Sequence, residues 1–139
     1  MGEAHLFTCD QLGGWKTIEG LAFESLVVNN FREFLSPLEL ERSLVVSAAP
    51  FRKDSRTGGE GVQVDLVLQT ALSVYFIEIK RQAEIGREVI DEMIEKVSRV
   101  RIPRGRAVKT ALIYSGRLAP IVEAQGYFNA VVDVCDILF

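Results

Sequence analysis

The stretch Gly61–Gln82, GVQVDLVLQTALSVYFIEIKRQ, decides the fold of this chain. Its first half, Val62 to Thr70, is apolar and rich in β-branched residues, and its second half, Val74 to Lys80, carries the same signal more strongly. Runs of this kind predict strands. The segment between them, Ala71-Leu72-Ser73, is short enough to turn the chain straight back. We therefore expect an antiparallel hairpin.

Charged residues are set into both predicted strands. Asp65 interrupts an otherwise buried run, where an ionised carboxylate is costly unless it is paired or binds a metal. Glu78 and Lys80 share one face because strand side chains alternate, and antiparallel pairing could place Asp65 beside Glu78. Two carboxylates and a lysine predict a site for Mg²⁺ or Mn²⁺. The alternative is a plain ion pair between Lys80 and one of the acids at the rim of the sheet.

An apolar stripe at helical spacing precedes the hairpin, between Thr17 and Leu35, and predicts an amphipathic helix. Glu24 falls inside this stripe because its neighbours one and two turns later are apolar. Its carboxylate could therefore face the hairpin and reach the metal. It could equally bind a backbone amide or be solvated, and the sequence leaves both interpretations open.

Between helix and hairpin, Ser36-Pro37 ends the helix and Leu38 to Ala49 predicts a strand that stops at Pro50. The next segment, Phe51 to Gly61, is charged and glycine-rich and predicts a loop. Most basic loops are merely solvated, but one beside a metal could bind phosphate. The candidate phosphate contacts in this loop are Arg52, Lys53 and Arg56.

After the hairpin, an apolar stripe from Ile85 to Val100 with acids opposite predicts a second helix. Basic residues gather at its end and beyond, in larger number than helix capping needs. We expect a surface for nucleic acid or a partner there. The candidates are Arg99, Arg101, Arg104, Arg106 and Lys109, with Lys96 at the start of the cluster.

The remaining chain predicts a strand over Thr110 to Tyr114, a short helix over Ala119 to Gly126 and a last strand over Ala130 to Leu138. The expected class is α/β, with the order αβββαβαβ. We assign residues 1–16 to an N-terminal arm and residues 17–139 to one domain.

The composition is that of an ordinary soluble domain, with 139 residues, 48% hydrophobic and 25% charged. The net charge of −3 argues against a protein that coats nucleic acid non-specifically. Cys9 and Cys135 lack metal-ligand spacing and predict reduced thiols. With no signal peptide and no membrane-spanning run visible, we expect a cytoplasmic protein that does not enter membranes.

These residues carry a resemblance. Glu24 on a helix, Asp65 and Glu78-Ile79-Lys80 on successive strands, and then a long helix and another strand resemble the PD-(D/E)xK nuclease superfamily. More narrowly, the segments at 20–31, 62–65, 76–80, 84–116 and 127–134 are similar to the nuclease-like C-terminal domain of a family of prokaryotic or archaeal-type AAA ATPases. The similarity covers nearly everything after Trp15.

The resemblance implies a restriction-endonuclease-like core that cuts DNA with Mg²⁺ or Mn²⁺. It implies that Asp65 and Glu78 bind the metal, that Glu24 is an accessory ligand and that Lys80 is the catalytic lysine. Val64 replaces the family's proline before the first acid. The phosphate-binding pattern GxxxxGK[ST] is absent from this sequence, so an ATPase would be a separate module. The alternative is an accessory module that binds DNA or protein without cutting.

Overall fold

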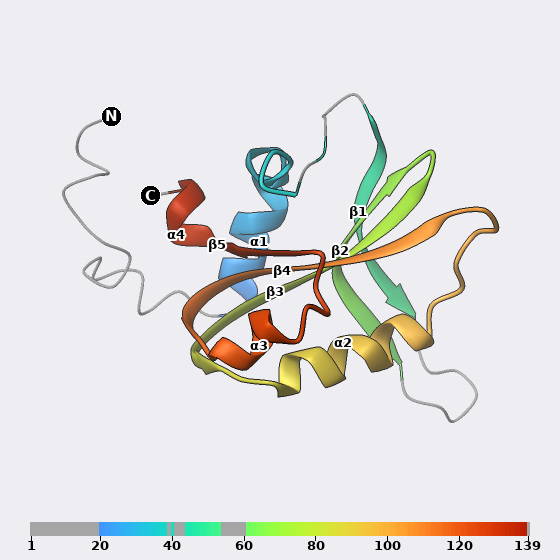
Figure 1. The fold of residues 1–139 in the computed structure, drawn as a ribbon. Helices are drawn as coiled ribbons and strands as arrows, with labels where there is room; N and C mark the ends of the chain where they lie inside the picture. The colour runs from blue at the N-terminus through green and yellow to red at the C-terminus, as the bar shows by residue number, and fades with distance from the viewer. Residues whose placement is uncertain (1–19, 39, 41–43, 54–60, 139) are drawn as a thin grey trace.

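The computed structural model describes residues 20–38, 40, 44–53 and 61–138. In chain order, the elements are α1 (Gly20–Asn29), the 3-10 helix η4 (Phe31–Phe34), β1 (Val45–Lys53), β2 (Val62–Thr70), β3 (Ser73–Ile85), α2 (Glu88–Ser98), β4 (Ala107–Leu118), α3 (Pro120–Ala124), β5 (Ala130–Asp133) and α4 (Val134–Leu138) (Figure 1). The predicted arm, residues 1–16, lies outside the described residues. None of the helices described is long and apolar enough to cross a membrane.

The strands within the described residues form a five-stranded sheet in the order β1-β2-β3-β4-β5. β1 to β2 and β2 to β3 are antiparallel, and the two residues between Thr70 and Ser73 make a tight reversal between β2 and β3. β3 to β4 and β4 to β5 are parallel, because α2 and α3 carry the chain back to the starting end of the sheet (Figure 1). The expectation of an α/β protein with a mixed sheet flanked by helices is confirmed.

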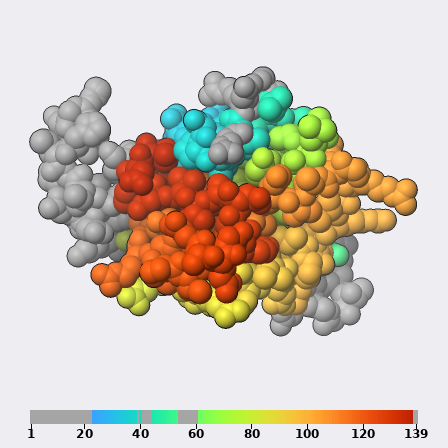
Figure 2. Space-filling model, in the orientation of Figure 1, coloured from blue at the N-terminus to red at the C-terminus, as the bar shows by residue number. Residues whose placement is uncertain are grey.

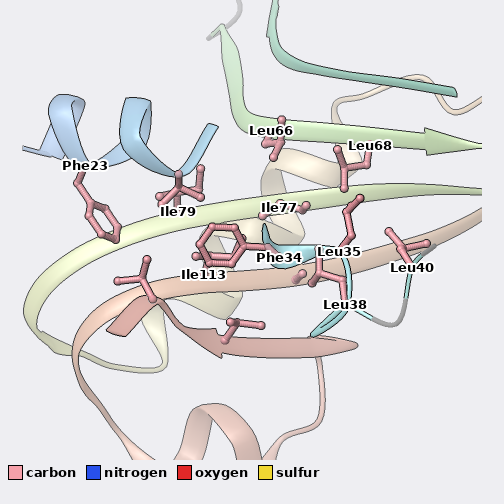
Figure 3. Packing of buried hydrophobic residues seen from close by; sticks show 14 residues of the cluster. Phe23, Phe34, Leu35, Leu38, Leu40, Leu66, Leu68, Ile77, Ile79 and Ile113 are labelled. Carbon is pink, nitrogen blue, oxygen red and sulfur yellow. The ribbon is translucent and has the colours of Figure 1, made fainter. Parts of the chain in front are cut away.

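Helices cover both faces of this sheet, with a separate apolar core beneath each cover. On one face, α1, η4 and α4 pack on β2, β3, β4 and β5 through residues such as Phe23, Phe34 and Ile79 (Figure 3). On the other face, α2 and α3 pack through residues such as Met93 and Val122. Figure 2 shows the C-terminal segments filling the middle of one side of the molecule, with η4 above them and α2 below.

The first half of the chain departs from the prediction in three places. The strand expected from Leu38 begins only at Val45. The single helix expected between Thr17 and Leu35 is divided into α1 and η4. The predicted stop at Pro50 is wrong, because β1 continues through it to Lys53. Pro50 lies where the pairing register with β2 shifts, between Ala49 and Phe51, and β1 is the outer strand of the sheet. Edge strands and bulges tolerate proline because its missing N–H is not needed there.

The end of the chain also differs from the prediction. The expected last strand over Ala130 to Leu138 is half right, because β5 ends at Asp133 and α4 follows. Asp133 Oδ1 accepts a hydrogen bond from the Cys135 amide at 2.9 Å, which is the kind of bond that starts a helix. Cys135 is disulfide-bonded, so the prediction of a reduced thiol there is wrong. Cys9 lies outside the described residues.

At Gly116 the backbone of β3 leaves no room for a side chain on β4. Its φ of +125° is a conformation that other residues rarely adopt, and a Cβ there would lie 1.7 Å from the backbone oxygen of Gln82. The pairing of β3 with β4 is irregular at the same place, between Arg81 and Glu84. A glycine is therefore required for β4 to stay paired with the far end of β3.

Candidate functional site

The hairpin register places the two predicted metal ligands side by side. Leu66 pairs with Ile77, so Asp65 and Glu78 follow as the next opposed positions. The described pairing between β2 and β3 stops at Leu66. Beyond this point, the Asp65 carboxylate replaces a backbone carbonyl as the hydrogen-bond acceptor for β3. Its Oδ2 accepts a hydrogen bond from the Ile79 amide at 2.9 Å. Asp65 is thereby held at the point where the two strands separate.

Glu24 comes to the same place from α1. Its neighbour Phe23 and the residue one turn later, Val27, are buried in the core beneath α1, which fixes the helix against the sheet. Glu24 itself is half-buried and interacts with the Asp65 carboxyl by charge and by hydrogen bonding. Of the two interpretations that the sequence left open, the structure therefore favours the inward-facing carboxylate.

Two lysines meet the acids through α2. Lys96 Nζ donates to both carboxylate oxygens of Glu78, at 3.1 Å to Oε1 and 2.9 Å to Oε2. Lys80 Nζ lies 3.1 Å from Oε2 of Glu92. The side chain of Glu78 is only 2% exposed, whereas those of Lys96 and Glu92 are 29% and 47% exposed. The buried acid is thus neutralised by a lysine that reaches in from the surface.

Burial controls the protonation of the two acids. It raises the pKa of Glu78 from 4.5 to about 7, and the adjacent Asp65 adds to the rise while Lys96 opposes it. Burial likewise raises the pKa of Asp65, with hydrogen bonds to Glu78 and the Ile79 amide opposing the rise and Glu24 adding to it. Buried, adjacent carboxylates resist ionising together. A bound cation, in addition to Lys96, would favour the ionised form of both carboxylates.

The same acids stabilise the charged form of Lys80. Burial lowers its pKa, but the hydrogen bond to Glu92 and the charges of Glu78, Glu92 and Asp65 outweigh burial, so the pKa is raised overall. Lys80 therefore stays positively charged at neutral pH. The predicted grouping of Asp65, Glu78 and Lys80 is present, although the Lys80 ammonium is bonded to Glu92.

The acids have the oxygen donors that a hard divalent ion prefers. Their side chains, however, are not arranged around a common ion position. Carboxylate oxygens are the donors that Mg²⁺ prefers. Within the part of the chain that the structure describes, however, no three His, Cys, Asp or Glu side chains are positioned to hold a metal ion together. Lys96 occupies both oxygens of Glu78, and the Ile79 amide occupies one oxygen of Asp65. A metal would have to displace Lys96.

An open groove of about 220 Å³ adjoins these residues, between α2 and the beginning of β2. It is lined by Gly61, Val62, Gln63, Glu92, Glu95, Lys96 and Arg99. Arg52 pairs with Gln63 and Lys53 with Val62 along the neighbouring strand β1, so both basic residues lie next to the groove wall. Arg56, the third basic residue predicted in this region, lies outside the described residues.

The remaining basic residues do not all gather at this groove. Arg99 lines it and pairs with Glu95. Arg106, in contrast, donates to Gln69 Oε1 at 2.6 Å, near the turn of the hairpin. Lys109 pairs with Tyr75 at the same end of the sheet. The predicted cluster is therefore divided between the groove and the hairpin turn, with the exposed Arg101 and Arg104 on the connection between α2 and β4.

Sequence reasoning missed the contacts of Lys96 and Glu92 with the site. The signal was present, since an acid and a lysine four positions apart lie on one side of a helix. The sequence places Glu92 among the acids opposite the apolar stripe and Lys96 in the basic cluster. Only the packing of α2 on β3 brings these two residues to Lys80 and Glu78.

Comparison with known proteins found no matching family model, no matching curated protein and no matching solved structure. Any assignment of function must therefore be argued from the residues of this chain.

Proposed function

We propose that this chain is a divalent-metal-dependent nuclease domain that hydrolyses DNA, of the PD-(D/E)xK kind. The observation that supports it most is the meeting of Asp65, Glu78 and the charged Lys80 where β2 and β3 separate, with Glu24 adjacent. A buried acid pair is costly to maintain without a purpose. Two adjacent carboxylates with a third beside them are the kind of oxygen donors that bind Mg²⁺ or Mn²⁺.

Each residue has a distinct role in this proposal. Asp65 and Glu78 would hold Mg²⁺ or Mn²⁺ through carboxylate oxygens, with Glu24 as an accessory ligand. When bound, the metal supplies an acidified water and a Lewis acid for the phosphoryl oxygen. Lys80 presents a positive donor where negative charge develops on the phosphate. Arg52, Lys53 and Arg99 would hold the DNA backbone along the groove.

Metal titration tests the proposal directly. Calorimetry should show Mn²⁺ binding to the wild-type chain, none to Asp65→Asn and weaker binding to Glu24→Gln. Glu84→Gln serves as the matched control, because Glu84 is an exposed acid on the same strand as Glu78 and pairs only loosely with Arg117, at 3.8 Å. Equal binding by Asp65→Asn and the wild type would place the ion elsewhere.

A second candidate is a non-catalytic DNA- or protein-binding module with the same fold. The observation that favours it is the internal neutralisation of the acids, with Lys96 on Glu78 and Lys80 on Glu92. A purified chain that binds DNA but cuts none with Mg²⁺ or Mn²⁺ would establish this function instead. Cleavage gained only on adding a separate AAA-type ATPase would make the domain one part of a larger machine.

A cytoplasmic location and an ATPase partner belong to the same proposal. Only the ATPase partner rests on the sequence resemblance. The disulfide at Cys135 removes the cysteine argument for a reducing compartment.

A further inference from the structure

The contact between Lys96 and Glu78 has the form of a carboxylate binding a cation. One ammonium group lies 3.1 Å and 2.9 Å from the two oxygens of the same carboxylate. The carboxylate is almost fully enclosed, whereas the lysine remains nearly one-third exposed, with side-chain exposures of 2% and 29%. The partner that can leave is therefore the lysine.

We propose that Lys96 is a resident counter-ion that occupies the metal position on Glu78 and must be displaced before a divalent ion can bind. This inference rests on the proposed function: Lys96 would regulate metal binding at the site proposed there. A buried carboxylate beside a second carboxylate needs a positive partner. Without a metal, the Lys96 ammonium is this positive partner. Its charge offsets the repulsion between the Asp65 and Glu78 carboxylates, so both can remain buried.

Lys80 does not perform this role, although it is closer in sequence to Glu78. Its ammonium bonds Glu92 on α2 and contacts the acids only through longer-range charge. Removing Lys80 would therefore reduce the positive charge near a metal without opening a ligand oxygen. Removing Lys96 would do both. The two lysines form a matched pair for an experiment.

The open groove beside Lys96 has room for its side chain after displacement from Glu78. Lys96 already contributes to the groove wall with Arg99 and Glu92, and Glu92 lies one helical turn before it, on the same side of α2. A displaced ammonium would face the groove, next to Arg99. Metal binding would thus add positive charge to the surface where an anionic backbone would lie.

The test compares Mn²⁺ binding by the wild type, Lys96→Met and Lys80→Met, using calorimetry at neutral pH. Loss of a charge-assisted hydrogen bond to the competing lysine should tighten Mn²⁺ binding by Lys96→Met roughly tenfold to hundredfold. Lys80→Met should tighten it by less. Lys96→Gln, which keeps a polar side chain, provides a second variant, and circular dichroism checks that each variant is folded.

Nitrogen-15 NMR of lysine side chains provides an independent readout on the wild-type chain. A lysine ammonium held by a buried carboxylate should exchange its protons slowly, so its signal should be visible without metal and assigned by its loss in Lys96→Met. Adding Mg²⁺ should abolish the signal or move it to the position of a solvated lysine. An unchanged Lys96 signal in the Mg²⁺-bound chain would overturn the inference.

The outcomes separate this inference from the proposed function. Metal binding by the wild type with no tighter binding by Lys96→Met than by Lys80→Met would overturn the role of Lys96 and leave the nuclease proposal intact. No metal binding by the wild type or either variant, together with a slowly exchanging Lys96 signal, would overturn both. In that case the lysine would be a permanent structural partner of Glu78.

Discussion

The titration of Glu78 should make the metal-free protein less stable as the pH rises through neutrality. The folded state holds the Glu78 proton up to a pH of about 7, whereas its ordinary pKa is 4.5. Between these values the folded state binds more protons than the unfolded state, so the free energy of unfolding falls with increasing pH. The stabilisation is fully present below pH 4.5 and is lost as the pH passes 7.

The size of this effect follows from the raised pKa. Each pH unit between the two pKa values is worth about 1.4 kcal/mol for a single group. A rise from 4.5 to about 7 therefore corresponds to a loss of about 3 kcal/mol across the window. Solvent screening does not reduce this figure much because Glu78 is only 1% exposed. The raised pKa of Asp65 acts in the same direction.

Urea unfolding at a series of pH values, with a chelator present, measures the effect. The informative quantity is the difference between the wild type and Glu78→Gln, because it cancels the contributions of acids that do not interact with Glu78 and reports Glu78 together with its coupled neighbour Asp65. The wild type should lose about 3 kcal/mol more than Glu78→Gln between pH 4.5 and 7.5, and the exposed Glu84→Gln should behave as the wild type does. Parallel curves for the wild type and Glu78→Gln would refute the reasoning.

Further perturbations test the site, the sheet and the basic surface. Lys80→Met should stay folded and bind Mn²⁺ yet cut DNA roughly a hundredfold more slowly, since it loses a preorganised donor; wild-type cleavage rates would remove Lys80 from the chemistry. Gly116→Ala should destabilise the fold by at least about 2 kcal/mol because its Cβ would collide with a β3 carbonyl. Gly105→Ala, which meets no atom within 4 Å, should cost only about 1 kcal/mol, and equal losses would contradict the close approach. Arg52→Ala with Lys53→Ala, which lie beside the groove, should weaken DNA binding equally across sequences and reduce its salt dependence by about one unit per lost contact; unchanged affinity would remove both residues from the DNA-binding surface.

The hairpin was predictable because its determinants are local. Alternation and β-branching predicted β2 with its observed bounds, Val62–Thr70, and the short connection fixed the antiparallel pairing. The strand through Pro50 was not predictable from proline chemistry alone, since proline stops a central strand and is tolerated at an edge. The position of β1 in the sheet decides between the two, and only the assembled sheet reveals it.

The helix at the end of the chain illustrates a different difficulty. The run from Ala130 to Leu138 is apolar and β-branched in its first half, which favours a strand throughout. Asp133 is the residue that divides it, because its carboxylate accepts the Cys135 amide and begins α4. An acid in the middle of an apolar run could have been interpreted as a helix start.

The site was predictable as far as the hairpin and the first helix provide it. The neighbourhood of Asp65 and Glu78 follows from hairpin register, and the approach of Glu24 follows from its place in an apolar stripe. The contact of Lys96 with Glu78 joins residues 18 positions apart. It depends on how α2 lies across β3, which periodicity does not specify.

Pro50 also bears on whether these molecules would join edge to edge. The outer side of β1 is the kind of surface on which a strand from a second molecule can extend a sheet. Pro50 offers no N–H to such a strand, and the register shift beside it interrupts the pleat, as does a second shift between Val45 and Ser47. The regular stretches that remain are Ser47–Ala49 and Phe51–Lys53. The second stretch carries Arg52 and Lys53, whose charges would repel an identical copy. Pro50 and the two basic residues after it thus oppose edge-to-edge pairing through β1.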